Sequence, residues 1–255
     1  MIEVRNLTKK YGDHLAVNDL SFTIEKGKIY GLLGPNGAGK STTMNIITGC
    51  LAATSGSVLI DGHDIFENPI EAKRHIGYLP EQPPLYTDMT AAEYLDFVAH
   101  AKGVPFEAAL RQVKEVMQLT GIEDVSDRLM KNLSKGYRQR VGIAQAMLGD
   151  PDVIILDEPT VGLDPKQIIE IRDLIKKLGT IKTVILSSHI LAEISAVCDH
   201  VMIISHGRLV ADDSIENLED SVNRANDLTI KVRGKAADVR AVLSGVKGII
   251  SAECT

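Results

Sequence analysis

The stretch Gly34–Ser41, with the sequence GPNGAGKS, decides the fold of this 255-residue chain. It matches the pattern G-x-x-x-x-G-K-[ST], in which glycines let backbone N–H groups converge on phosphate oxygens. Ile29–Leu33 before it is predicted to be a buried strand, and Gly39–Gly49 after it a single helix that glycine ends. This order of strand, loop and helix predicts a phosphate-binding loop. Its contacts are expected from Gly34, Pro35, Asn36, Gly37, Ala38, Gly39, Lys40, Ser41 and Thr42.

A second element supplies two adjacent carboxylates. The aliphatic run Val153–Leu156 is predicted to be a strand buried on both faces, and it ends in Asp157 and Glu158. Ligands of open α/β sheets bind at the carboxyl ends of the strands. We therefore expect Asp157 to hold Mg²⁺ together with Ser41, and Glu158 to orient or deprotonate an attacking water. Together the two elements indicate a phosphate-loop NTPase.

The remaining pattern predicts an α/β fold with a mostly parallel sheet. Short strands with turns fill the first 65 residues and predict an N-terminal antiparallel β-subdomain. Apolar residues then recur at helical spacing, which predicts a helical subdomain at about 87–150, whose first helix begins at the capping box Thr90–Glu93. Strands and helices alternate from Pro151 onward, as in a parallel sheet that helices cover on both faces. The predicted elements there are 153–156, 165–178, 183–186, 191–197 and 201–204.

The tail has a different pattern from the rest of the chain. We expect one ATPase domain over 1–220 and a small C-terminal appendix over 221–255. Leu228–Val232 alternates like a strand, Ala236–Leu243 has helical periodicity, and Val246–Ala252 fits another strand. This βαβ-like start has no evident completion, so the appendix is expected to be incomplete.

Composition excludes several classes of protein. Lys and Arg total 28 against 34 Asp and Glu, and the formal net charge of −6 argues against a protein that coats nucleic acid. No apolar run reaches the length of a membrane-spanning helix, so the chain alone is not expected to form a pore. Cys50, Cys198 and Cys254 show neither a disulfide framework nor zinc-site spacing, which favours a reducing compartment.

Further motifs resemble those of one NTPase family. Leu133–Arg140, LSKGYRQR, is similar to the signature sequence LSGGQxQR of ABC transporter ATPase subunits. Val161–Asp164 resembles the D-loop of that family, His189 its switch histidine, and Tyr11 the aromatic residue that stacks on adenine. The order and spacing of the motifs agree as well, and the resemblance runs from residue 2 to about residue 218.

The resemblance implies roles for individual residues. Ser134 and Gly136 are expected to touch the γ-phosphate, and His189 to act beside Glu158 where the γ-phosphate lies. Tyr11 is expected to bind the base and Asp164 to contribute from the D-loop.

The sequence departs from the family pattern at two places. Lys135 and Tyr137 stand in the signature where glycine and glutamine are commonest. In the Q-loop, Glu81 occupies the position of the glutamine and Gln82 follows it. Both are candidates for a metal contact, and Glu81 is favoured because a carboxylate binds Mg²⁺ or its water.

The resemblance also implies a mechanism and partners. Two ATPase subunits, either two copies of this chain or a paralogous pair, are expected to close head to tail around two ATP molecules with Mg²⁺. Hydrolysis would release the pair and drive a partner membrane permease, so the chain is expected to be cytoplasmic and peripheral on the inner face of the cell membrane. Ile76–Glu81 and Thr160–Pro165 resemble subunits of exporters for drugs, lipids or polysaccharides and gliding-motility subunits. The alternatives are an importer subunit and a soluble, non-transport ABC ATPase, and no nucleic-acid partner is expected.

Overall fold

The computed structural model describes residues 1–218 and 234–243. Contacts divide the chain into two units, Met1–Asn217 and Leu218–Thr255. In the second unit, helix α9 spans Ala236–Leu243, the range in which a helix is predicted. The strands predicted at 228–232 and 246–252 lie outside the described residues, so the incomplete appendix and its start at residue 221 stay predictions.

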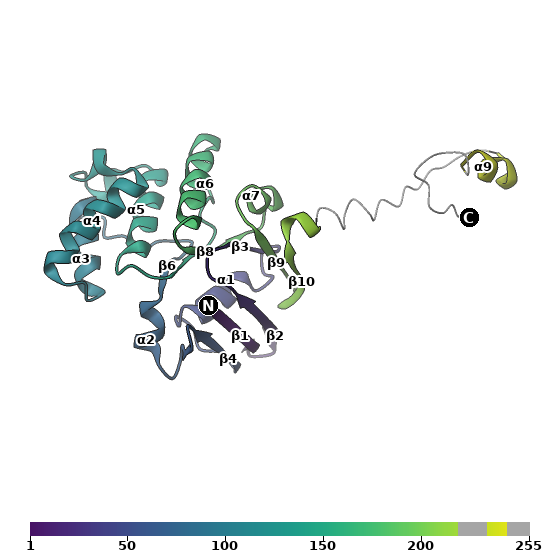
Figure 1. The fold of residues 1–255 in the computed structure, drawn as a ribbon, viewed down its shortest axis with the longest axis horizontal. Coiled ribbons are helices and arrows are strands. Elements are labelled where there is room, and N and C mark those ends of the chain that lie inside the picture. Colours follow the sequence, from purple (N-terminus) through teal and green to yellow (C-terminus); the bar gives the residue numbers. More distant parts are fainter. Residues whose placement is uncertain (219–233, 244–255) are drawn as a thin grey trace. The chain divides into compact units, whose positions relative to one another are not determined.

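A six-stranded sheet forms the centre of the first unit (Figure 1). The strand order is β10-β9-β3-β8-β7-β6, in which every neighbouring pair is parallel except β9 with the edge strand β10. All residues of β3, β7 and β8 are buried, which explains why β3, β7 and the centre of β8 are apolar runs rather than alternating patterns. The bounds are β3 Ile29–Leu33, β6 Ile76–Leu79, β7 Val153–Leu156, β8 Thr183–Ser188, β9 His200–Ser205 and β10 Arg208–Ser214.

A four-stranded antiparallel sheet forms the N-terminal subdomain, in the order β2-β1-β4-β5. Its strands are β1 Ile2–Tyr11, β2 His14–Ile24, β4 Ser55–Ile60 and β5 His63–Asp64. Helix α1, Lys40–Ile47, lies between this sheet and the parallel one (Figure 1). Its apolar residues Met44, Ile46 and Ile47 belong to one buried core with residues of both sheets. Burial of that shared core fixes the N-terminal sheet against the phosphate-loop helix.

Helices α3 Ala91–Ala101, α4 Phe106–Thr120 and α5 Lys135–Met147 form the helical subdomain beyond β6 (Figure 1). They bury an apolar core of their own, which includes Tyr94, Leu95 and Met117. The predicted capping box is confirmed: Glu93 N donates to Thr90 Oγ1 at 3.2 Å and Thr90 N to Glu93 Oε2 at 2.8 Å. Two short 3₁₀ turns, Glu123–Val125 and Met130–Asn132, lead into α5. The predicted fold class, including the antiparallel and helical subdomains, is thereby confirmed.

Helices α6, Pro165–Gly179, and α7, Leu191–Ser195, follow β7 and β8 as expected. Helix α2, Pro69–Arg74, and strand β6 were not predicted. In β6 the glycine is required by packing, because a Cβ at Gly77 would lie 1.9 Å from the carbonyl oxygen of Ala146 in α5.

Lys102 joins the end of α3 to the end of α5. Its ammonium donates to the carbonyl oxygens of Gln145 and Leu148 at 2.9 Å and of Ala146 at 3.3 Å. These oxygens belong to the last turn of α5, where helical carbonyls lack backbone partners and the helix dipole favours a cation.

We predict that Lys102→Ala lowers the free energy of unfolding by about 1 kcal/mol, because these carbonyls lose a charged donor. Urea unfolding followed by circular dichroism measures the effect. Lys114→Ala, which removes an exposed lysine of α4, serves as the control and is expected to leave the midpoint unchanged. Equal midpoints for the two variants would contradict this role of Lys102.

Candidate functional site

A cavity of about 530 Å³ lies at the carboxyl ends of the central strands. The parallel register brings these ends together, since Leu33 of β3 pairs with Ser188 of β8, and Leu156 of β7 pairs with Leu186 of β8. Ten of the predicted site residues line the cavity: Tyr11, Asn36, Gly37, Gly39, Lys40, Ser41, Thr42, Glu81, Glu158 and His189. The other lining residues are His14, Ala16 and Val161.

The phosphate loop is shaped by steric limits on its glycines. Gly39 precedes α1 with φ of 108°, a conformation that L side chains rarely adopt, and a Cβ there would lie 2.5 Å from Ala16 O. At Gly34 a Cβ would lie 2.2 Å from Ile204 O. The loop is therefore pressed against β2 and β9, and the first N–H groups of α1 face an open cavity where an anion would be stabilised. Gly34, Pro35 and Ala38 belong to the loop but do not line the cavity.

Lys40 and Glu158 form a buried ion pair. The Lys40 ammonium lies 3.5 Å from Glu158 Oε1, and the two side chains are only 5% and 8% exposed. The same ammonium donates to Gly34 O at 2.7 Å and to Pro35 O at 3.3 Å. Two buried charges are costly unless they compensate each other. The pair thus holds a cation at the loop and an anion opposite it in a site of low dielectric constant.

Asp157 is buried beneath the cavity. Its Oδ1 accepts hydrogen bonds from Ser187 Oγ at 2.6 Å and from Ser41 Oγ at 3.3 Å. Burial raises the pKa of this carboxyl above its usual range, while both serine hydroxyls act in the opposite direction. A carboxylate and a hydroxyl in contact are a donor set that suits Mg²⁺, and a cation there would favour the ionised form of Asp157.

Glu158 has the strained backbone expected of a functional residue. Its φ is 47°, which is uncommon for a residue other than glycine, and its side chain is almost fully buried. Glu158 N donates to Ser187 Oγ at 2.8 Å, and Glu158 Oε2 lies 3.0 Å from His189 Nδ1. The two residues with predicted catalytic roles are therefore in contact.

The hairpin of β1 and β2 forms the outer wall of the cavity. Tyr11 and His14 face each other across the turn, and Tyr11 is 49% exposed. The ammonium of Lys9 lies 5.1 Å from the centre of the Tyr11 ring, a cation–π contact. The sequence by itself assigns no role to His14. Its place directly across the hairpin from Tyr11 was the signal that could have identified it.

The two Q-loop candidates occupy different positions. Glu81 lines the cavity, whereas Gln82 is absent from its lining. Ser187 is a further residue that sequence reasoning did not assign. A serine at the end of a wholly buried apolar strand, next to the strand that carries Asp157, was the available signal.

Ser134, Gly136 and Asp164 lie apart from the phosphate loop. They line a second cavity of about 310 Å³, together with Tyr137, Arg140, Lys166, Gln167 and Glu170. Ser134 caps α5 by accepting from Tyr137 N at 3.3 Å, and Asp164 caps α6 by accepting from Gln167 N at 2.9 Å. The signature and the D-loop residue thus share one surface of the chain, and the phosphate loop belongs to another.

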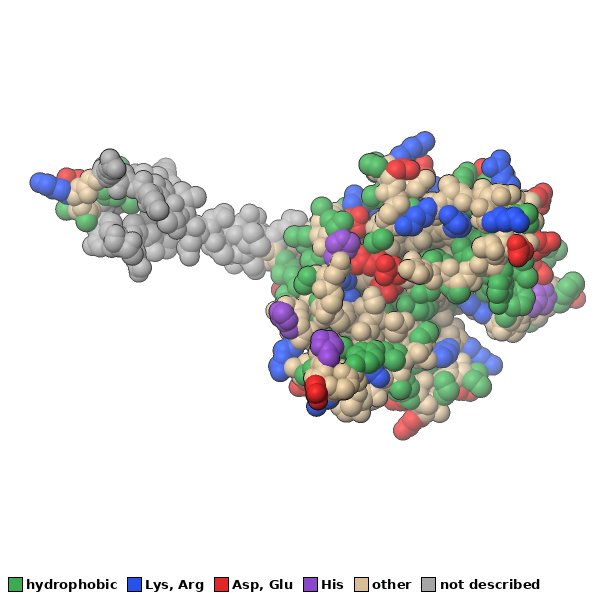
Figure 2. Space-filling view, turned by 180° about the vertical axis from the view of Figure 1, so that it is seen from behind, with side chains coloured by type: hydrophobic (Ala, Val, Ile, Leu, Met, Phe, Trp, Pro, Cys, Tyr) green, Lys and Arg blue, Asp and Glu red, His purple; other side chains and the backbone are tan. Residues whose placement is uncertain are grey.

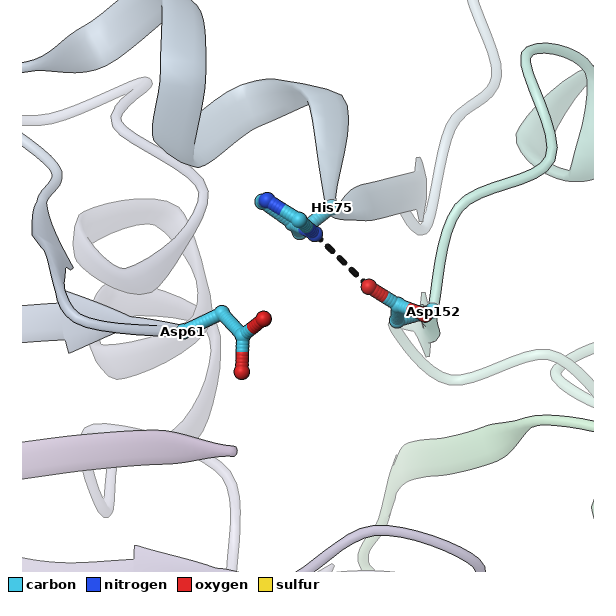
Figure 3. A group of neighbouring side chains, drawn as sticks. All are labelled: Asp61, His75 and Asp152. Atoms are coloured by element: carbon cyan, nitrogen blue, oxygen red, sulfur yellow. Dashed lines mark hydrogen bonds and ion pairs between the residues drawn. The ribbon is translucent and has the colours of Figure 1, made fainter.

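One group of metal-ligand type lies at the amino ends of the strands instead. His75 Nδ1 is 2.6 Å from Asp152 Oδ2, directly before β6 and β7, and Asp61 approaches both (Figure 3). Asp61 also pairs with Lys26 at 3.2 Å. His75 and Asp152 lie at the opposite ends of β6 and β7 from Glu81 and Asp157, so this group is separate from the cavity described above.

Comparisons with known proteins agree with this geometry. The sequence family described as "ABC transporter" matches residues 17–161. An uncharacterized ABC transporter ATP-binding protein of Bacillus subtilis, YhcH, is 42% identical over 89% of this chain and 73% of its own length. The bacitracin transport ATP-binding protein BcrA of Bacillus licheniformis is 38% identical over 92% of this chain and 77% of its own.

A solved structure has the same fold. The ATP-binding cassette MJ0796, a dimer in a post-hydrolysis state bound to ADP and Pi, superimposes with a TM-score of 0.75 at 27% identity. The superposition covers 84% of this chain and 99% of that one. With the phosphate loop, the paired carboxylates and the signature helix in place, this chain belongs to the ABC transporter family as an ATP-binding ATPase cassette.

Proposed function

We propose that this chain binds and hydrolyses ATP as the energising subunit of an ABC exporter. The observation that carries the proposal is the meeting of Lys40, Glu158 and His189 around one cavity at the end of the parallel sheet, where Asp157 bonds to Ser41 of the cavity lining. The phosphate loop would bind the triphosphate through its N–H groups and Lys40. Tyr11 would hold the adenine ring by stacking.

Glu158 is suited to orient and deprotonate the attacking water. Its carboxylate is compensated by Lys40 on one oxygen and contacts His189 through the other. His189 would hold Glu158 in place and contact the γ-phosphate. Ser41, Asp157 and Glu81 would hold Mg²⁺ directly or through water, and the ion would neutralise charge on the phosphates during transfer.

The division of motifs between two cavities supports a two-subunit site. Ser134, Gly136 and Asp164 surround the N-terminus of α5, where helical N–H groups suit an anion. They would complete the site of a partner subunit by contacting the γ-phosphate there, and the partner would do the same in return. The dimeric state of MJ0796 supports this arrangement.

The direction of transport is proposed from relatives. The name of BcrA supports a role in transport, and a relative named Nod factor export ATP-binding protein I, 33% identical over 87% of this chain, supports export. The chain would then bind a membrane permease at the inner face of the membrane. Among residues 1–218 and 234–243, the structure contains no helix long and apolar enough to cross a membrane. An importer subunit is the first alternative, and co-purification with a permease followed by a transport assay in vesicles would separate the two directions.

A soluble ABC ATPase that acts on nucleic acid is the less favoured alternative. The face drawn in Figure 2 carries basic and acidic side chains interspersed with each other rather than a continuous basic surface. The formal net charge of −6 also disfavours nucleic-acid binding, since proteins contact phosphate backbones through clustered Lys and Arg.

Glu158→Gln is predicted to slow ATP hydrolysis by about 100-fold to 10,000-fold, because the amide accepts no proton from water. ATP binding is expected to persist, so an ATP-held dimer should accumulate in size-exclusion chromatography. Glu67→Gln, at an exposed glutamate in the turn before α2, is the matched control. Wild-type turnover in Glu158→Gln would refute the role of this residue as base.

Lys40→Ala is predicted to weaken ATP affinity by about 10-fold to 100-fold, the loss expected when one charge-assisted contact to phosphate is removed. Fluorescence titration with a labelled ATP analogue measures the affinity. Lys114→Ala controls for net charge. The substitution also removes the ion pair of the buried Glu158, so circular dichroism must show a folded protein. Wild-type affinity in that folded variant would overturn the assignment.

Glu81→Ala is predicted to raise the Mg²⁺ concentration at half-maximal ATPase activity by about 10-fold, as for other groups around a bound ion. Gln82→Ala, one residue further on, is expected to leave the Mg²⁺ requirement unchanged. Titration of the ATPase rate with Mg²⁺ distinguishes the two residues. A shift in Gln82→Ala alone would assign the Q-loop role to Gln82 instead.

A further inference from the structure

A buried carboxylate behind the site is not used by the mechanism above. Glu193, in α7, is only 7% exposed, and it accepts two hydrogen bonds on the same oxygen, Oε2. The donors are Thr160 Oγ1 at 2.7 Å and Ser188 Oγ at 2.9 Å. Both donors are buried as well, with 6% and 1% of the residue exposed. Hydrogen bonds to a charged acceptor are about twice as strong as neutral ones. The contacts of Glu193 with Thr160 and Ser188, called the Glu193 junction below, are therefore strong.

The two donors lie beside the catalytic pair, Thr160 in the loop after Glu158 and Ser188 at the end of β8. Thr160 is two residues beyond Glu158, and Ser188 immediately precedes His189. Local hydrogen bonds stiffen both segments: Val161 N donates to Glu158 O at 3.2 Å, and Ile190 N donates to Ser188 Oγ at 3.1 Å. Glu193 therefore links the loop of Glu158 to the loop of His189 through short, well-bonded segments.

The charge of Glu193 is compensated from the other side by α6. Arg172 Nη2 lies 4.0 Å from Glu193 Oε1, and Arg172 Nε is buried without a hydrogen-bond partner among the residues that the structure describes. Removing the carboxylate would therefore leave the Arg172 guanidinium without its nearby anion and would destabilise this region. Substitution of the hydroxyl donors tests the junction more cleanly than substitution of Glu193 does.

We infer that Glu193 is a positioning residue, which uses Thr160 and Ser188 to fix the separation between the Glu158 carboxylate and the His189 imidazole. The inference rests on the proposed ATP hydrolysis. The Glu158–His189 contact is 3.0 Å, and His189 is itself 39% exposed on its side chain, so packing alone does not immobilise the imidazole. A loop shift of about 1 Å at such a pair is enough to slow the chemical step without preventing ATP from binding.

The decisive comparison is Thr160→Val against Thr160→Ser, measured as steady-state ATPase activity of the full chain. Valine has the shape of threonine but lacks the hydroxyl, whereas serine keeps it. We expect Thr160→Val to lower kcat by about 10-fold with KM for ATP within about twofold of wild type. Thr160→Ser should restore kcat to within about twofold. Ser188→Ala should behave like Thr160→Val.

A purely structural role predicts a different pattern. It would lower thermal stability and activity together, so Tm is measured for each variant, and Thr160→Val is expected to lose kcat at a Tm within a few degrees of Thr160→Ser. In a His189→Ala background, Ser188→Ala should cause no further loss, because the Ser188 bond acts through His189. A full additional loss there, equal kcat values for the valine and serine variants, or a rise in KM at unchanged kcat would each overturn the inference.

Glu158→Gln separates this inference from the proposed function. If the wild-type chain hydrolyses ATP, Glu158→Gln does not, and Thr160→Val retains full kcat, the positioning role alone fails. If the wild-type chain and Glu158→Gln are equally inactive with ATP, the proposed function fails instead.

Discussion

Parallel hydrogen bonding among β3, β8 and β7 is the constraint on which the site depends. Parallel strands end at the same edge of a sheet, so residues far apart in sequence meet there. In this register Leu33 pairs with Ser188, and Leu156 pairs with Leu186. A slip of one residue would reverse the faces of a strand and separate Asp157 from the phosphate loop. Complete burial of all three strands keeps that register fixed.

The same burial makes isolated charges at the site energetically unfavourable. Lys40 and Glu158 lie in a region where isolated charges are unfavourable, and they compensate each other at 3.5 Å. Apolar residues of similar volume would satisfy such a core equally well, so stability does not explain the pair. Because buried charges are poorly screened by water, Lys40 interacts more strongly with a phosphate than an exposed lysine would. Phosphate binding therefore explains the burial of the two charges.

Sequence reasoning predicted the parts whose chemistry is local. The phosphate loop, the carboxylates after 153–156 and the capping box at Thr90 each depend on residues close together in sequence. It missed β6, because four residues with a central glycine give no periodic signal, and the reason for Gly77 lies in a carbonyl of α5. His14 and Ser187 were missed for a similar reason. His14 lies at the site because β2 pairs with β1, and Ser187 because β8 lies next to the strand that carries Asp157.

The loop from Glu158 to Asp164 connects the two cavities over a short span. Glu158 and Val161 line the first cavity and Asp164 lines the second. Thr160 lies between them, held by a hydroxyl bond to a buried carboxylate and by its carbonyl, which accepts from Leu163 N at 3.2 Å. One short segment therefore carries both the carboxylate of the first cavity and a lining residue of the second. In the proposed head-to-tail pair, this segment would lie between one ATP, bound beside Glu158, and the second ATP, which Asp164 would approach in the partner's site.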